Sequence, residues 1–194
     1  MGRPTIVVRD ACPDDLPEVL EMWAELREIG GRLERATPPA SPDGALDRLL
    51  AITMDPDSRA LIATSGDEVA GMAVLTCAQY APLFDQVAVH VHYLHVREGH
   101  RRRGVGKALL AAAASFAEEV GAEHMITSVL PQLRETNRFY ARLGFSPVVV
   151  RRSVPVSMLR RCLAAQGVAG AADNLLVRRR TLRRVRAAMA RVGD

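Results

Sequence analysis

The sequence predicts a mixed α/β (α+β) domain in which helices pack on a central sheet. Amphipathic helical segments alternate with short strand segments rich in β-branched residues, and a hairpin turn joins one pair of strands. The chain has 194 residues, of which 48% are apolar and 25% charged, so it can bury a core and has the composition of a globular protein. The expected order is β-α-α-β-β-β-α-β-α-β, followed by a helical extension.

Hydrophobic periodicity and turn residues place these elements along the chain. The expected strands are residues 5–9, 59–64, 68–77, 87–96, 124–129 and 145–152, and the expected helices are residues 13–30, 44–53, 104–120, 132–143 and 156–165. The turn Ser65-Gly66-Asp67 is typical of a hairpin, and residues 36–44, which contain three prolines, are expected to form a loop. After Asp173 the chain is expected to be helical to about Val192, with residues 174–178 as an alternative edge strand.

Positive charge in this chain is almost entirely arginine. The formal net charge is +4, Lys107 is the only lysine, and arginines cluster at residues 101–103 and 178–191. Charge alone gives weak, salt-dependent binding to nucleic acid. No nucleic-acid-reading motif accompanies it, and aromatic residues that could stack on bases make up only 4% of the chain. We therefore expect no nucleic-acid partner, and assign the basic C-terminal helix to packing on the domain or on a partner subunit, as in a homodimer.

The sequence lacks the usual signals of secreted, membrane and metal-binding proteins. No basic segment followed by an apolar one opens the chain, and the longest apolar run, residues 108–114, is far too short to span a membrane. Cys12, Cys77 and Cys162 lack C-x-x-C spacing, which argues against a disulfide framework and a zinc site. These features predict a cytoplasmic protein with no membrane partner and no metal.

The segment Arg101-x-x-Gly104-x-Gly106 lies between an expected strand and an expected helix. Main-chain N–H groups at the start of a helix are unpaired and attract anions, and glycines allow phosphate oxygens to approach the main chain. Arginine side chains add attraction for phosphate. The segment therefore predicts a pyrophosphate site, although it is neither a P-loop nor a dinucleotide fingerprint. The alternative for so short a motif is a tight turn flanked by solvated arginines.

A second segment, Asn137-Arg138-Phe139-Tyr140 followed by Gly144-Phe145, adds to the first. Together they resemble the two signatures of the GCN5-related N-acetyltransferase (GNAT) superfamily, with a typical gap between them. The order of elements over residues 5–152 is similar to that family. The resemblance implies a mostly antiparallel mixed sheet, an acetyltransferase domain at residues 1–153 with a C-terminal helical extension at 154–194, and acetyl-CoA as co-substrate.

The resemblance also implies roles for individual residues. The strand before the arginine turn would splay from the next strand, with the pantetheine arm of acetyl-CoA between them. The Leu94 amide would stabilise the thioester oxyanion, and Tyr140 would protonate the departing thiolate. The residues expected to contact the cofactor are Leu94, His95, Val96, Arg101, Arg102, Arg103, Gly104, Val105, Gly106, Lys107, Asn137 and Tyr140. Helical spacing independently places Asn137 and Tyr140 on one face. Without the Arg101-x-x-Gly104-x-Gly106 motif, Tyr140 would be interpreted as a half-buried core tyrosine.

A general base is harder to assign from the sequence. His90 and His92 are candidates because imidazole titrates near neutrality, and His90 occupies a position similar to that of a strand glutamate in some family members. Strand alternation places these two on one face and His95 on the other, which argues against a three-histidine metal site. Structural histidines, or deprotonation of the amine through water, are the alternatives.

The resemblance further implies that the acceptor side lies at the first two helices and the loop between them. Carboxylates there and before the histidine strand could attract a cationic amine, although surface helices carry such charges routinely; they are Glu21, Glu25, Glu28 and Asp85. The sequence thus predicts an N-acetyltransferase in which a primary amine attacks acetyl-CoA directly in a ternary complex. The alternative is a non-catalytic acyl-CoA-binding regulatory module on the same fold.

Overall fold

The computed structural model describes residues 5–30 and 41–166. Its strands are β1 (Ile6–Asp10), β2 (Ser58–Ser65), β3 (Glu68–Gln79), β4 (Val87–Val96) and β5 (His124–Thr127). Its α-helices are α1 (Leu16–Gly30), α3 (Pro42–Met54), α4 (Val105–Glu119), α5 (Arg134–Ala141) and α6 (Val156–Ala165), and two short 3-10 helices are η1 (Pro13–Asp15) and η2 (Glu98–His100). The chain divides into two compact units, residues 1–142 and 143–194. A domain boundary at residue 153 stays a prediction.

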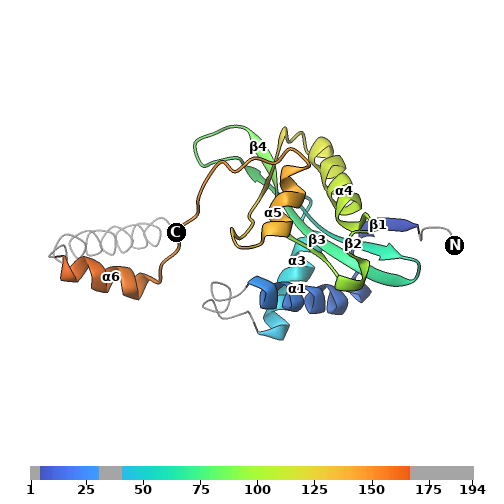
Figure 1. The fold of residues 1–194 in the computed structure, drawn as a ribbon, viewed down its shortest axis with the longest axis horizontal. Coiled ribbons are helices and arrows are strands. Elements are labelled where there is room, and N and C mark those ends of the chain that lie inside the picture. The colour runs from blue at the N-terminus through green and yellow to red at the C-terminus, as the bar shows by residue number, and fades with distance from the viewer. Residues whose placement is uncertain (1–4, 31–40, 167–194) are drawn as a thin grey trace, which may run out of the picture. The chain divides into compact units, whose positions relative to one another are not determined.

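The first unit contains a five-stranded sheet with strand order β1-β2-β3-β4-β5 (Figure 1). Each pair of neighbouring strands is antiparallel except β4 and β5, which are parallel. The hairpin turn between β2 and β3 is made by Gly66 and Asp67, and Gly66 has a φ of 66°, which glycine adopts without strain. The predicted mixed, mostly antiparallel sheet is confirmed.

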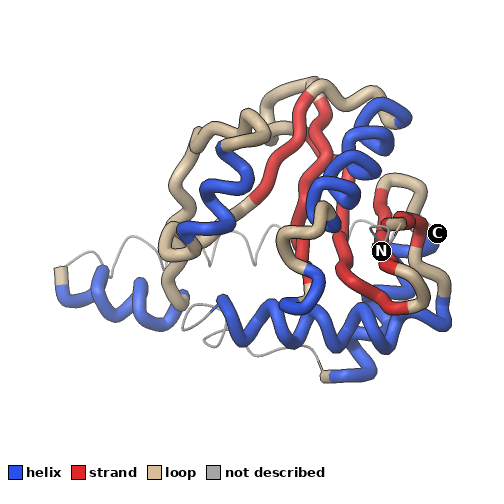
Figure 2. Tube along the Cα trace, turned by 45° about the vertical axis from the view of Figure 1, so that its right-hand side comes forward, coloured by secondary structure: helices blue, strands red, loops and turns tan. Residues whose placement is uncertain are grey.

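Helices cover both faces of this sheet (Figure 2). Met72 on β3 belongs to the buried cluster that includes Leu16 and Met22 of α1. Its neighbour Gly71 points the opposite way, because a Cβ there would lie 3.0 Å from Val105 and 3.3 Å from Leu109 of α4. Since successive residues of a strand face opposite sides, α1 and α4 pack on opposite faces. We call these the α1 face and the α4 face.

Helices α1 and α4 bury apolar residues at helical spacing. On α1, Leu16, Val19 and Met22 are buried. On α4, the buried residues at helical spacing include Leu109, Ala113 and Phe116. Each of the larger side chains among them contributes about 1.5–3 kcal/mol when it is removed from water, so these residues fix both helices on the sheet.

A predicted helix start and a predicted strand differ from the structure for local reasons. Helix α3 begins at Pro42 rather than at residue 44, because Ser41 caps it with an Oγ that accepts from the Gly44 N–H at 3.2 Å. Residues 145–152 form no strand in the described part of the chain. Their β-branched residues favour a strand, but a strand needs a pairing partner, and Val148, Val149 and Val150 are exposed instead. The predicted helix after Asp173 and its alternative strand lie outside the described residues.

Candidate active site

Strand β4 carries a bulge and runs beyond its neighbour β5. Its register with β3 shifts between Val74 and Leu75, and His92 is the β4 residue left without a cross-strand partner. The parallel ladder with β5 ends at the pair of Val91 and Thr127. Because β5 ends at Thr127 and β4 continues to Val96, the last five residues of β4 have no partner on β5.

The main-chain groups of Leu94 and Val96 face the edge of β4 that β5 leaves open. The Arg97 N–H donates to the Ala70 carbonyl on β3 at 3.0 Å, and successive residues of an antiparallel strand direct their N–H and C=O groups to alternate edges. The amides of Leu94 and Val96 therefore point away from β3. The Arg101 side chain is consistent with this direction, because its Nε donates to the Val96 carbonyl at 3.1 Å.

Helix α4 begins with N–H groups that have no helical acceptor. The Ala108 N–H makes the first i→i−4 hydrogen bond, to the Gly104 carbonyl at 3.0 Å, so the N–H groups of Val105, Gly106 and Lys107 lack such a bond. Gly104 has a φ of 101°, which strains any residue with a side chain. A helix start of this kind attracts phosphate, which fits the pyrophosphate of coenzyme A.

Gly106 allows the start of α4 to lie close to α5 and to the end of β4. A Cβ at this position would lie 3.3 Å from Phe139 Cζ and 3.7 Å from Val96 Cγ2. Protein interiors are close-packed, so a side chain here would require the Phe139 ring to shift. The structure therefore brings both sequence motifs together at the open edge of β4.

The basic side chains of this turn are exposed, namely those of Arg101, Arg102, Arg103 and Lys107. Arg102 adopts a φ of 61°, and its Nη2 donates to Glu135 Oε1 of α5 at 3.1 Å. Both of these side chains are more than four-fifths exposed, and such surface pairs contribute little to stability. The positive charge of the turn is thus accessible to an anion from solvent.

Tyr140 lies beside Thr127, which belongs to the last pair of β4 with β5. Its side chain is buried and hydrogen-bonds to the side chain of Thr127, whose Oγ1 also donates to the Val91 carbonyl at 3.3 Å. Burial raises the pKa of Tyr140 above its ordinary value, and the Thr127 hydrogen bond opposes part of that rise. The phenol therefore keeps its proton at neutral pH, as a proton donor must.

Asn137 is exposed, and its side chain hydrogen-bonds to the loop that precedes α5. Its Nδ2 donates to the carbonyls of Leu130 at 3.0 Å and Leu133 at 2.8 Å. These bonds fix the connection between β5 and α5, so Asn137 positions the helix that carries Tyr140. A direct contact of Asn137 with the cofactor stays a prediction.

The bulge in β4 corrects the predicted orientation of the three histidines. His95 pairs with Met72 and His90 pairs with Thr76, and these two β3 residues share the α1 face because they are four apart on a regular strand. His92 Nε2 lies 2.7 Å from Thr76 Oγ1, so it faces the same side. Simple alternation placed His95 on the opposite face, which is wrong because it ignored the extra residue of the bulge.

The His95 side chain contacts helix α1. It is 4% exposed, and its Nε2 lies 2.8 Å from Glu25 Oε2. Tyr93, two residues earlier, packs edge-to-face on Trp23 of the same helix at a centroid distance of 6.4 Å. The main-chain groups of His95 face β3, because they alternate with those of Leu94 and Val96. A contact of His95 with the cofactor stays a prediction.

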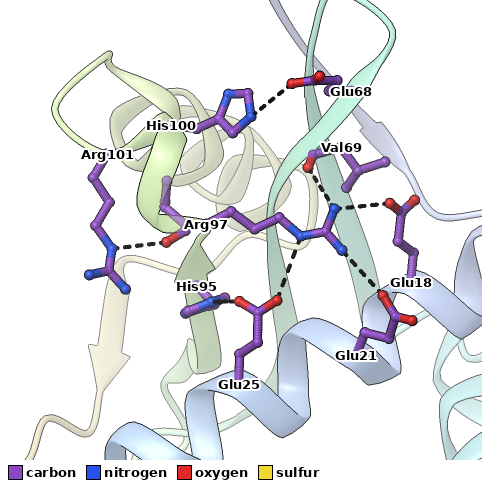
Figure 3. A network of polar contacts seen from close by, with 10 residues as sticks. Glu18, Glu21, Glu25, Glu68, Val69, His95, Arg97, His100 and Arg101 are labelled. Atoms are coloured by element: carbon purple, nitrogen blue, oxygen red, sulfur yellow. Dashed lines mark hydrogen bonds and ion pairs between the residues drawn. The ribbon is translucent and has the colours of Figure 1, made fainter.

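Arg97, which sequence reasoning did not single out, organises a network between β4 and α1 (Figure 3). Its guanidinium lies 3.0 Å from Glu18, 3.5 Å from Glu21 and 3.8 Å from Glu25. Glu21 and Glu25, expected to attract an acceptor amine, are thus paired within the protein. Glu18, Glu21 and Glu25 are three and four residues apart and so share one helix face, which is the sequence signal that could have indicated a cationic partner.

The remaining predicted acceptor carboxylates, Glu28 and Asp85, are exposed.

Across the described residues, no group of three or more His, Cys, Asp or Glu side chains is arranged to hold a metal ion. No helix in the described ranges has both the length and the apolar character needed to cross a membrane.

Comparisons with known proteins agree with this geometry. Streptothricin acetyltransferase of Streptomyces lavendulae is 31% identical over 93 residues, which are 47% of each chain, so the chain spans about half the length of this curated relative. A transcriptional regulator from Bacillus halodurans C-125 has a similar fold, with a TM-score of 0.66, 21% identity, and coverage of 78% of this chain and 99% of that one.

Two further solved structures share the fold. A GCN5-related N-acetyltransferase from Ralstonia eutropha JMP134 has a TM-score of 0.64 and 24% identity, and covers 79% of this chain and 99% of its own. An aminoglycoside acetyltransferase from an uncultured soil metagenomic sample has a TM-score of 0.62 and 14% identity, with coverage of 78% and 96%. The model of the acetyltransferase (GNAT) family matches residues 23–145, more than half of the sequence. The chain therefore belongs to the acetyltransferase (GNAT) family.

Proposed function

We propose that this protein is an N-acetyltransferase that uses acetyl-CoA to acetylate a primary amine by direct attack in a ternary complex. The observation that carries the proposal is the open edge of β4 at Leu94 and Val96, next to the unpaired N–H groups that start α4. An extended pantetheine arm can hydrogen-bond along such an edge, while the helix start binds the pyrophosphate.

The residues present fit this cofactor. The N–H groups of Val105, Gly106 and Lys107 have no helical acceptor, and the exposed arginines around them complement the charge of phosphate. When bound, acetyl-CoA supplies a thioester as the acyl donor. The Leu94 N–H, directed to the open edge, would donate to the thioester oxygen as negative charge develops there. Tyr140, buried and protonated, would give its proton to the leaving sulfur.

The relatives suggest which amines to test first. One is a streptothricin acetyltransferase and another is an aminoglycoside acetyltransferase, so amino-group-bearing antibiotics belong in the acceptor panel beside peptides and simple amines. The fold alone does not select among them.

The proposal is tested by calorimetry with coenzyme A, followed by an acceptor screen that records free thiol release and acetylated products by mass spectrometry. We expect coenzyme A to bind and one class of amine to gain an acetyl group. A protein without affinity for coenzyme A would contradict the proposal.

The alternative function is a regulatory acyl-CoA-binding module. It is kept because one protein with a similar fold is described as a transcriptional regulator. Tight binding of coenzyme A without acetylation of any amine in the panel would favour this alternative.

A further inference from the structure

One carboxylate on helix α1 contacts the residues on both sides of Val96, the last residue of β4 (Figure 3). Glu25 Oε2 lies 2.8 Å from His95 Nε2, and Glu25 Oε1 lies 3.8 Å from Arg97 Nε. An ionised carboxylate only accepts hydrogen bonds, so His95 Nε2 carries a hydrogen and donates to Glu25. Because the His95 side chain is only 4% exposed, this contact fixes its ring between β4 and α1.

The part of β4 that Glu25 holds is paired on one edge only. The ladder of β4 with β3 continues to Val96, whereas its ladder with β5 ends at Val91. On the β3 side the packing is tight, because a Cβ at Gly71 would lie 2.7 Å from the His95 carbonyl oxygen. The other edge lacks the hydrogen bonds of a neighbouring strand, so the contacts with α1 supply a restraint that the sheet does not.

The restrained residues adjoin the main-chain group expected to act in catalysis. Leu94 directly precedes His95, and its N–H points to the open edge, where the thioester of acetyl-CoA would bind. Peptide groups are planar, so a movement of the His95 main chain is passed on to the peptide groups next to it. The direction of the Leu94 N–H therefore depends on how firmly His95 is held.

We infer that Glu25 is a positioning residue for acetyl transfer, which holds His95, and with it the Leu94 N–H, in line with the thioester oxygen. This inference rests on the proposed acetyltransferase function. An oxyanion donor is effective because it is already aligned where negative charge develops, and a small misplacement removes much of the effect. Glu25 acts here through His95, and no proton is transferred to or from either side chain.

Glu18 separates this role from a general contribution to stability. Its Oε1 accepts from Arg97 Nη1 at 3.0 Å, so it belongs to the same network as Glu25. Seven residues, about 10.5 Å along the helix axis, separate the two glutamates. Figure 3 shows Glu18 on the far side of the Arg97 guanidinium from His95. Removal of Glu18 therefore weakens the network without freeing the His95 ring.

The first test needs no acceptor amine. Acetyl-CoA with an isotopic label at its carbonyl carbon is bound to the protein, and infrared difference spectroscopy records the carbonyl stretch. A hydrogen bond from Leu94 polarises the carbonyl, so the wild type should shift this stretch to lower frequency than in free acetyl-CoA. Glu25→Ala should lose most of the shift and Glu18→Ala should keep it. Glu25→Gln should keep most of it, because glutamine still offers an oxygen to His95.

The second test measures kinetics with the amine found in the screen. The rate is divided by the number of coenzyme A sites counted by calorimetry, so that unfolded protein does not appear as a loss of rate. The kcat of Glu25→Ala should fall roughly tenfold to 100-fold, with little change in either KM. Glu25→Gln should recover most of the rate, and Glu18→Ala should keep the wild-type kcat even where urea unfolding shows lower stability.

Three results would overturn the inference and leave the acetyltransferase proposal intact. They are a wild-type carbonyl stretch without a shift, a stretch and a kcat that do not change in Glu25→Ala, and a higher KM for the amine at unchanged kcat. Glu25→Leu, which fills the space with an apolar side chain, takes the place of Glu25→Ala if that variant does not fold. A wild-type protein that does not bind coenzyme A would instead contradict the proposed function.

Discussion

Arg97 and Glu18 form a partly buried ion pair in which Arg97 Nη1 donates to Glu18 Oε1 at 3.0 Å (Figure 3). The same nitrogen donates to the Val69 carbonyl at 3.3 Å. Arg97 directly follows β4 and precedes the turn that leads to α4. The pair therefore ties helix α1, expected on the acceptor side, to the strand and turn expected to hold the cofactor.

The first prediction is that Arg97→Met destabilises the fold. It leaves three carboxylates without their common cation, and it removes hydrogen bonds to Glu18 and Val69. Loss of charge-assisted hydrogen bonds at a site that is 27% exposed should lower the free energy of unfolding by about 1–3 kcal/mol. Urea unfolding followed by circular dichroism measures this. Arg97→Lys should recover part of the loss, because lysine keeps the charge without the planar fork.

Arg103→Met is the matched control, because the Arg103 side chain lies in the turn before α4 and is exposed to solvent. It should change stability by less than about 0.5 kcal/mol. Equal stability of Arg97→Met and Arg103→Met would show that the network does not hold α1 in place.

The second prediction concerns the helix start. Gly104→Ala forces a side chain into a φ of 101°, which costs about 1–3 kcal/mol or reshapes the turn. Either outcome disturbs the N–H groups expected to hold the pyrophosphate, so the Kd for coenzyme A measured by calorimetry should rise about tenfold or more. Gly99→Ala serves as the control, because a Cβ there meets nothing within 4 Å and the residue does not have a positive φ. An unchanged Kd in Gly104→Ala would argue against the pyrophosphate assignment.

Local sequence patterns predicted the order of elements well, because strand and helix periodicities and turn glycines are local properties. The bulge at His92 was not predictable in this way. It depends on how β3 and β4 align along nearly their whole lengths, and one extra residue reverses the face of every later side chain. That reversal is why His95 contacts Glu25 of α1 instead of the other face.

The predicted strand at residues 145–152 does not form because no strand of the described residues pairs with it. Val148, Val149 and Val150 have the sequence character of a strand, yet they are exposed and outside any ladder of the described residues. Strand propensity describes fitness for a pleated, half-buried surface, and it does not supply the neighbouring strand. Arg97 was missed for a related reason, since its partners Glu18 and Glu21 lie more than 70 residues earlier.

The third prediction is a pH-dependent loss of stability through Asp15. Arg9 donates to this carboxylate at 2.6 and 2.9 Å, and the Cys12 N–H donates at 2.7 Å, which together hold the pKa of Asp15 well below its ordinary value. A carboxylate with a lowered folded pKa stabilises the fold above its unfolded pKa near 3.8, and that contribution is lost as the pH falls below it.

Asp15→Asn should therefore be less stable than the wild type at pH 7, by about 1 kcal/mol because Arg9 is half exposed, and the difference should shrink below pH 4. Urea unfolding between pH 2 and 7 measures it. Asp14→Asn, at an exposed neighbouring position, is the control. A stability difference that stays constant down to pH 2 would contradict the assignment to the Asp15 carboxylate.

The last prediction concerns Tyr140 and its partner Thr127. Tyr140→Phe removes the expected proton donor while keeping the buried ring, so kcat should fall about 100-fold with little change in the Kd for coenzyme A. Because burial raises the pKa of Tyr140 above its ordinary value, the phenol stays protonated from pH 7 to 9, and the wild-type rate should show no decline from this group in that range.

Thr127→Val tests the direction of the shift. It removes the hydrogen bond that lowers the pKa of Tyr140, so the phenol should lose its proton at a still higher pH. Ultraviolet titration of tyrosinate absorbance, with Tyr140→Phe to identify the signal, follows this change. A signal for Tyr140 that moves to lower pH in Thr127→Val, or a Tyr140→Phe protein that releases thiol at the wild-type rate, would remove Tyr140 from the role of general acid.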